Sequence, residues 1–314
     1  MSVRGQVRRA LARAGGSMAR GLAREAARQP GGRPFAEARV VEGRDVRAIP
    51  VGEPVTGPEG MGFVDGIQRF AVEGHFGVTP VVRAQVAAAA LERHGGALRC
   101  AARSVEEFLT VPRDRLTTDQ WEALTDVGLP IQESDPGPRP HPLLDRWAAV
   151  QVIEQRRDRC EADAAARFLA ARPDAWLVVD GGVTGLAAVR GADRAIGVVK
   201  SHETQFLEAT DLEAALTLPA GSRSSAFVRR GAGGVEATSW YLRLWPWSEE
   251  DLLHGLARVE RLTARGALDS ADDVSRWLLA ERSPVADRDP RWERLLYPMH
   301  HVEMYMRAEA GGWH

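Results

Sequence analysis

Two aspartates and one lysine are the residues of this sequence whose types and spacing could do chemistry. Asp65 and Asp180 each stand at the end of a short apolar run, in a Val-Asp-Gly segment. This pattern is typical of a strand that presents a carboxylate at a sheet edge and then turns. A further apolar run, Ala195 to Val199, ends on Lys200, the only lysine among 41 basic residues. Because arginine replaces lysine poorly where a compact point charge is needed, the three residues together predict a phosphate and metal site.

Each of these residues has a plainer interpretation. Asp-Gly is also the commonest hairpin signal, so either aspartate alone could simply mark a turn. Lys200 could be an exposed charge at the end of a strand. Two aspartates on strands, followed by a retained lysine, favour the site.

The composition describes a globular protein with no strong electrostatic preference. The chain has 314 residues, 44% of them hydrophobic and 27% charged, with a formal net charge of −2. Two cysteines, Cys100 and Cys160, form no metal-binding motif, which fits a reducing cytoplasm and argues against structural zinc. Since no apolar run approaches the roughly 18 residues of a membrane span, we expect a cytoplasmic protein without a membrane partner.

The first 60 residues differ from the rest of the chain. Residues 1–30 hold seven arginines against one acid, Glu25, and residues 29–60 are rich in glycine, proline and charge. We therefore predict an Arg-rich N-terminal arm and loop over residues 1–60, with one short strand, and a single domain over residues 61–314. The start of the arm fits a docking helix, a disordered arm or, less well, a targeting signal.

The hydrophobic pattern predicts both strands and helices. A meander of short strands covers 61–65, 68–73 and 78–83, with a turn at Gly66, and strands are also expected at 97–102, 176–179, 195–199, 225–229 and 237–245. Helices are expected at 84–93, 143–171, 248–263, where Ser248 and the acids after it form an N-terminal signal, and 270–280.

This order of elements predicts an α/β fold with an RNase H-like mixed sheet flanked by helices, an N-terminal arm and C-terminal helices. Such a core collects acids from separate strands and a helix around two divalent ions. The long helix offers Glu154, Asp158, Glu161 and Asp163. Glu154 and Glu161 are seven residues apart and so share a helical face, and either could point at the sheet edge.

The sequence resembles the NurA family of nucleases, which are partners of HerA-type hexameric DNA translocases. The resembling segments lie in the family's order along roughly residues 60–307: Gly62 to Gly66, Leu177 to Gly182, Ile196 to Ser201, Trp240 to Leu244, Ala257 to Glu260, and Tyr297-Pro298. The resemblance implies Mn²⁺- or Mg²⁺-dependent cleavage of DNA at a two-metal site. It also implies a homodimer and a HerA-like hexameric ATPase as partner.

The resemblance assigns roles to individual residues. It implies that Asp65, Glu161 and Asp180 bind the metals, and its spacing favours Glu161 over Glu154. A tyrosine near the site falls on Tyr241. The family's C-terminal helix carries a histidine near the metals, and in register that position is Tyr305 in this chain. This departure leaves open whether His300 or His301, one turn earlier, serves instead.

Lys200 and Tyr241 would place the DNA strand. Lys200 would contact a phosphate or orient a metal-bound water. Strand alternation puts Tyr241 and Arg243 on one face, which suits stacking on a base and a phosphate contact, although the nearby tryptophans make Tyr241 a candidate core residue as well. The alternative function is a DNA-clamping adaptor subunit with a decayed site, which the change at Tyr305 supports. An RNA-directed RNase H-like enzyme is a third, weaker interpretation.

Overall fold

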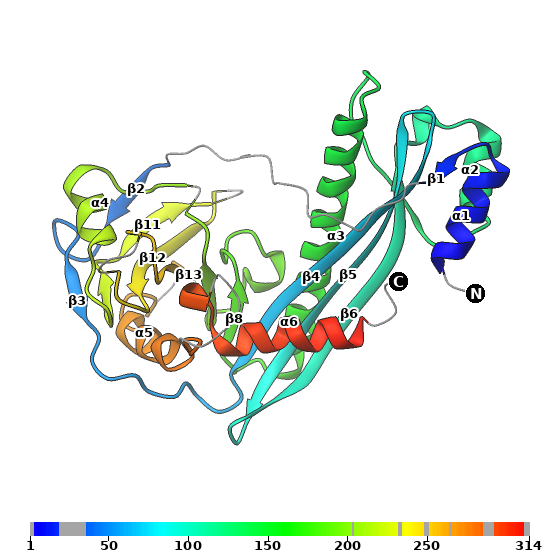
Figure 1. Ribbon diagram of the computed structural model, residues 1–314. Helices are drawn as coiled ribbons and strands as arrows, with labels where there is room; N and C mark the ends of the chain where they lie inside the picture. Colours follow the sequence, from blue (N-terminus) through cyan, green and yellow to red (C-terminus); the bar gives the residue numbers. More distant parts are fainter. Residues whose placement is uncertain are drawn as a thin grey trace.

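The computed structural model describes residues 3–18, 36–202, 204–231, 234–247, 251–263, 266–284 and 292–310 (Figure 1). Its strands form one mixed sheet in the order β2-β11-β12-β13-β9-β8-β4-β5-β6-β7. Three long antiparallel strands dominate one half: β4 (Gly62–Phe76), β5 (Thr79–His94) and β6 (Ala97–Val111). This architecture confirms the predicted α/β class with a mixed sheet flanked by helices.

The other half of the sheet begins on the side of β4 that does not pair with β5. β8 (Leu177–Asp180) pairs parallel to β4, and β9 (Ala195–Val199) pairs parallel to β8. The antiparallel strands follow: β13 (Leu256–Leu262), β12 (Glu236–Arg243), β11 (Phe227–Arg230) and β2 (Ala38–Val40). At the far edge of the long strands, β7 (Ile131–Glu133) pairs parallel to the end of β6. Three short strands complete the sheet. β1 (Ser17–Met18) pairs with β4, and β10 (Ser222–Ser224) pairs with both β12 and β3 (Ala48–Pro50).

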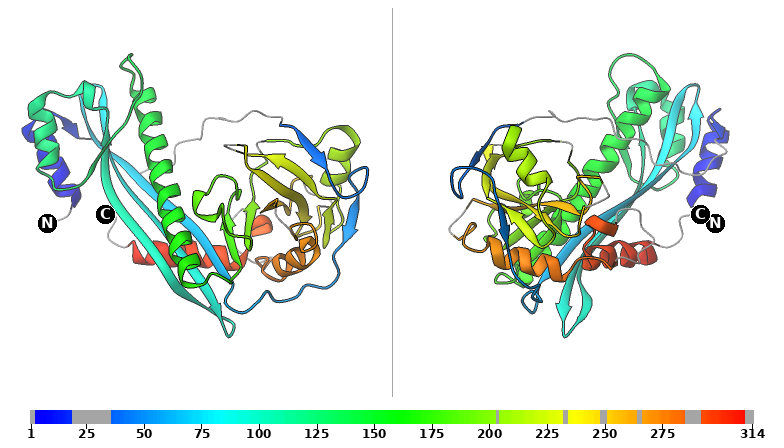
Figure 2. Two further views of the ribbon diagram at one scale, coloured as in Figure 1. Left: turned by 180° about the vertical axis from the view of Figure 1, so that it is seen from behind. Right: turned by 60° about the vertical axis from the view of Figure 1, so that its left-hand side comes forward.

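Two helices cover opposite faces of the long strands (Figure 2). α3 (Pro142–Ala171) packs Ile153 and Cys160 against alternate residues of β5, such as Ala88. α6 (Tyr297–Glu309) packs Val302 on the other face, in a core cluster with Ala89. The remaining helices are α1 (Val3–Arg13), α2 (Thr118–Thr125), α4 (Ala209–Leu216) and α5 (Ala271–Ala280). The predicted helices at 143–171 and 270–280 are confirmed.

The prediction of a helix over Ala84 to Arg93 is wrong, because this segment is the middle of β5. Fourteen consecutive residues of β5 are buried, since α3 covers one face of the strand and α6 covers the other. A strand buried on both faces loses the polar alternation that identifies strands in a sequence. Alanine favours a helix in isolation, but here its small side chain lets both helices approach, and tertiary packing overrides propensity.

The predicted helix over residues 248–263 is also wrong where the structure describes it. Residues 256–262 form β13, which is hydrogen-bonded between β12 and β9 and buried along most of its length. The N-terminal signal at Ser248, Glu249 and Glu250 lies outside the described residues. Two neighbouring strands provide the backbone partners that a helix would otherwise supply internally.

The N-terminal segments pack against both halves of the sheet. α1 buries Val7 and Leu11 against Phe76 and Val81, at the end of the long strands. Arg4 and Arg83 both lie against Glu73, which is 1% exposed. The later arginines of the predicted N-terminal arm, which are Arg20, Arg24 and Arg28, lie outside the described residues.

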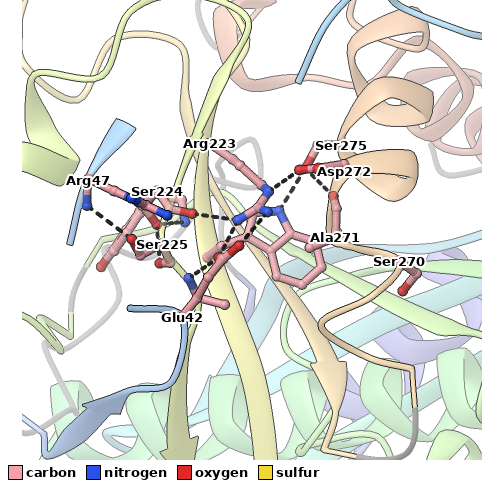
Figure 3. A network of polar contacts seen from close by, with 12 residues as sticks. Glu42, Arg47, Arg223, Ser224, Ser225, Ser270, Ala271, Asp272 and Ser275 are labelled. Carbon is pink, nitrogen blue, oxygen red and sulfur yellow. Dashed lines mark hydrogen bonds and ion pairs between the residues drawn. The ribbon is translucent and has the colours of Figure 1, made fainter. Parts of the chain in front are cut away.

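A second polar network holds the segment between β2 and β3 (Figure 3). The guanidinium of Arg223, on β10, donates to both carboxylate oxygens of Glu42 and to Asp272 at the start of α5. Glu42 also accepts from the backbone N–H of Ala226. This segment is therefore anchored to the same sheet as the rest of the chain, and the predicted boundary at residue 61 remains a prediction.

Candidate metal and phosphate site

Asp65 is a buried carboxylate with one unsatisfied oxygen. It lies on β4 between Phe63 and Ile67, which both contribute to the core beneath α6, and alternation places it on that same face. The residue is 4% exposed; Oδ1 accepts from the N–H of Gly66 at 2.7 Å, whereas Oδ2 is buried without a hydrogen bond. Burial raises the pKa of Asp65 well above its ordinary value, and the charges of Asp180 and Glu161 raise it further.

Asp180 stands beside Asp65 on the neighbouring parallel strand. The ladder between β4 and β8 pairs Val64 with Val179, and the aspartates are the next residue of each strand. β8 then ends, and Gly181 takes a φ of +93°, which confirms the turn predicted after this aspartate. No such turn follows Asp65: β4 runs straight on through Gly66, so the turn predicted at Gly66 is wrong.

Lys200 is the cation of the site. It follows the end of β9, the strand next to β8, and its Nζ lies 2.7 Å from Oδ1 of Asp180. Burial would lower the pKa of Lys200, but Asp180 and Asp65 together outweigh burial, and the pKa is raised. The ammonium therefore stays charged, and the structure brings together the two aspartates and the lysine that the sequence singled out.

Glu161 reaches the site from α3, across Gly66. A Cβ atom on Gly66 would lie 2.5 Å from Oε1 of Glu161 and 2.8 Å from its Cγ, so glycine is required here by the close approach of the helix. Glu161 pairs with Arg157 at 3.1 Å on the same helix. Burial raises the pKa of Glu161 to about 7, with contributions from Asp158 and Asp180. Glu154 lies about two turns earlier on α3.

Glu303 on α6 acts electrostatically on the site and was not among the predicted site residues. Its charge raises the pKa of both Asp65 and Lys200, and its side chain is 13% exposed. It forms an ion pair with Arg307, at 3.5 Å and one turn later on the helix. The segment from Tyr297 to Arg307 carried a usable signal, because only Glu303 within it is acidic.

Of the other C-terminal candidates, Tyr305 and His301 contact residues outside the acidic group. The hydroxyl of Tyr305 accepts from Arg103 on β6 at 3.4 Å, and Glu303 rather than Tyr305 is the α6 residue whose charge acts on Asp65. The ring of His301 packs against that of Tyr297, with 4.4 Å between ring centroids. His300 has a buried Nδ1 without a hydrogen bond. The role of Tyr305 in the site remains a prediction.

Tyr241 lies in the core rather than on a surface. It is 2% exposed and packs with Phe227, at 5.8 Å between ring centroids, in the cluster beneath α4. Arg243 is fully buried and donates to backbone carbonyls, including that of Leu216. Burial of both side chains favours the core interpretation of Tyr241 over base stacking, and a role in placing DNA remains a prediction.

The carboxylates suit a hard divalent cation in kind, because Mg²⁺ and Mn²⁺ prefer oxygen ligands. The buried, unpartnered Oδ2 of Asp65 is the atom that most needs such an ion. In the arrangement observed, however, the described residues contain no group of three or more acidic, histidine or cysteine side chains close enough to enclose an ion. The side chains fit a cation by chemistry, and two of the three acids, Asp180 and Glu161, are ion-paired with Lys200 and Arg157.

Comparison with known proteins gives a structural likeness but no match in sequence. No protein-family model matches the sequence, and no curated protein matches it. The chain is similar in structure to the NurA nuclease from Sulfolobus solfataricus. The TM-score is 0.48 with 10% sequence identity, over 86% of this chain and 81% of that one. This identity is too low to transfer the role of any residue. None of the described helices is both long and apolar enough to cross a membrane.

Proposed function

We propose that this protein is a metal-dependent nuclease that hydrolyses phosphodiester bonds of DNA with Mn²⁺ or Mg²⁺. The observation that carries the proposal is Asp65, a buried acid with an unsatisfied oxygen, next to Asp180 and Glu161 from two other elements. Acids that repel one another in a core destabilise it, and the unpartnered Oδ2 of Asp65 is where a bound cation would relieve that repulsion. The resemblance of the sequence motifs to those of the NurA family supports the same activity.

The side chains would divide the chemistry as follows. Asp65, Asp180 and Glu161 would hold the cation, which would polarise the phosphate and activate a water. Lys200, charged and fixed by Asp180, would neutralise charge on the attacked phosphate. Arg157, paired with Glu161, would hold that carboxylate over the sheet edge.

We further propose that the protein acts on DNA ends as a homodimer with a HerA-like hexameric ATPase, in repair or phage defence. With a formal net charge of −2, the chain is poorly suited to capturing duplex DNA by its own field. A translocase that delivers the DNA would remove that requirement.

The test is cleavage of end-labelled linear DNA in Mn²⁺ by wild type and by Asp180→Asn, each with and without a HerA-type ATPase. We expect cleavage by wild type and a loss of at least about a hundredfold in the variant. Asp163→Asn, at an exposed position on α3, is the matched control and should cleave like wild type. If folded wild type cleaves nothing even with the ATPase, the adaptor function, which the change at Tyr305 favours, replaces the nuclease.

A further inference from the structure

The segment from Ala257 to Glu260 contributes a buried polar cluster that has no part in the chemistry proposed above. Glu260, on β13, accepts hydrogen bonds from Nε and Nη2 of Arg229 on β11, at 2.7 and 2.6 Å. It also accepts from Nε of Arg258, two residues earlier on its own strand, at 3.0 Å. We call Arg229, Arg258 and Glu260 the buried cluster.

The buried cluster is a poor device for stability alone. Its three charged side chains are at most 9% exposed. Withdrawing such groups from water costs so much that apolar residues of similar volume are often equally stabilising. The placement of the cluster therefore points to a role other than stability.

The chain that leaves Asp180 crosses the sheet directly over this cluster. A Cβ on Gly197 of β9 would lie 2.7 Å from the carbonyl oxygen of Gly181, and a Cβ on Gly182 would lie 2.8 Å from Oε2 of Glu260. Gly197 and Glu260 are partners in the ladder between β9 and β13. The two glycines after Asp180 therefore cross a single rung of the sheet, and their approach requires that no side chain intervene.

Thr184 fastens this crossing segment to the cluster. Its side chain is buried, and its Oγ1 accepts a hydrogen bond from Nη2 of Arg229 at 3.1 Å. The neighbouring Val183 packs in the core with Val179. The segment over residues 181–184 thus has one apolar and one polar anchor, and the polar anchor is the buried cluster.

The chain that leaves Lys200 reaches the same cluster. The ring centroid of Phe206, six residues after Lys200, lies 4.5 Å from Cζ of Arg258 and 5.4 Å from Cζ of Arg229. Asp180 and Lys200, which are 2.7 Å apart, stand at the ends of neighbouring strands. The segments that follow the two members of this ion pair are therefore held by one group of side chains.

We propose that Glu260, Arg229 and Thr184 are positioning residues, which hold the segments leaving β8 and β9 so that the carboxylate of Asp180 and the ammonium of Lys200 stay in contact. The cluster acts through these segments and not on the substrate, because its side chains are withdrawn from the surface. The inference rests on the proposed function, since the pair being positioned is the one that would act on DNA.

The experiment uses Lys200 as its own probe. Because Lys200 is the only lysine, protein labelled with ¹³Cε-lysine gives a single side-chain resonance. Wild type, without metal, defines the chemical shift of the paired ammonium, and Asp180→Asn defines that of the unpaired one. Thr184→Val removes the hydroxyl that accepts from Arg229, and the resonance should move at least halfway to the unpaired value. Thr184→Ser keeps a hydroxyl and should restore the wild-type shift.

A matched control separates positioning from a general loss of packing. Thr238 is as buried as Thr184 and shares a hydrogen bond with Thr263 at 3.2 Å, so Thr238→Val also removes one hydroxyl contact. It should leave the Lys200 resonance and DNA cleavage unchanged. Thr184→Val should lower kcat at least about tenfold with KM unchanged, because the reacting groups are displaced while DNA binding is kept.

A second variant perturbs the centre of the cluster. Glu260→Gln places an amide N–H against a guanidinium, and the Lys200 resonance should move as in Thr184→Val. If Glu260→Gln does not fold, Thr184→Val decides alone. A wild-type resonance or a wild-type kcat in folded Thr184→Val would overturn the inference.

Failure of the inference is distinguishable from failure of the proposed function, because the resonance of Lys200 does not depend on cleavage. If wild type cleaves no DNA but the resonance moves in Thr184→Val and not in Thr238→Val, the positioning of the ion pair stands and the nuclease is rejected. If wild type cleaves DNA and Thr184→Val matches it in both measurements, the nuclease stands and the positioning role is rejected.

Discussion

Replacing Glu161 by glutamine should stabilise the protein at high pH, and the magnitude follows from the burial of this side chain. Burial raises the pKa of Glu161 from an ordinary 4.5 to about 7. At about 1.4 kcal/mol for each pH unit, ionised Glu161 costs the folded state about 3 kcal/mol relative to its neutral form. Glutamine resembles the neutral form, so Glu161→Gln should remove this cost.

The pH dependence has a definite sign. The pKa of Glu161 is higher in the folded than in the unfolded protein, so folding takes up a proton between about pH 4.5 and about pH 7. The stability of wild type relative to Glu161→Gln therefore falls as pH rises through this window. The difference should be about 3 kcal/mol at pH 8 and shrink to about 1 kcal/mol at pH 5.

The assay is urea denaturation with a chelator present, followed by circular dichroism, at pH 8 and pH 5. Asp163→Asn is the control, because Asp163 lies on the same helix with its side chain 41% exposed; its effect should stay within about 0.5 kcal/mol at both pH values. Equal stability of wild type and Glu161→Gln at pH 8 would refute the reasoning. A stabilisation that does not shrink at pH 5 would refute it equally.

Three other perturbations test the surroundings of the site. Gly66→Ala should push Glu161 aside, because the new Cβ would lie 2.5 Å from its Oε1, and DNA cleavage should fall at least about tenfold. Gly191→Ala is the control, because nothing lies within 4 Å of a Cβ at that position. Equal cleavage activity of the two variants would contradict the close packing of Glu161 on Gly66. Glu303→Gln should weaken Mn²⁺ binding measured by calorimetry, since one negative charge acting on Asp65 is lost; unchanged affinity would exclude Glu303 from the site. Glu73→Gln should lower the free energy of unfolding by about 3 kcal/mol in urea denaturation, because it removes the buried carboxylate that pairs with the buried Arg83. A loss below about 1 kcal/mol would mean that Glu107 alone suffices.

The sequence predicted the parts of the site whose signals are local. Asp180 ends a short strand before a glycine in the left-handed region, and Lys200 follows an apolar strand, so each could be read from a few neighbouring residues. The long helix that carries Glu161 was equally visible from its period. These signals need no knowledge of what lies across the sheet.

The remaining features depend on contacts between distant segments. Gly66 looked like a turn, but it is a strand residue that makes room for Glu161, nearly a hundred positions later in the chain. The alanines of β5 looked helical because nothing local shows that two helices cover the strand. Glu303 was missed because its importance comes from α6 crossing the face on which Asp65 lies.

The central claim is that Asp65 organises a cation-dependent nuclease site, and the most direct measurement is DNA cleavage as a function of Mn²⁺ concentration by wild type and Asp65→Asn. We predict cleavage that rises and saturates with Mn²⁺ in wild type, and none above background in a folded variant that is as stable as wild type or more so. Cleavage that is independent of Mn²⁺, or equal in the two proteins, would contradict the claim.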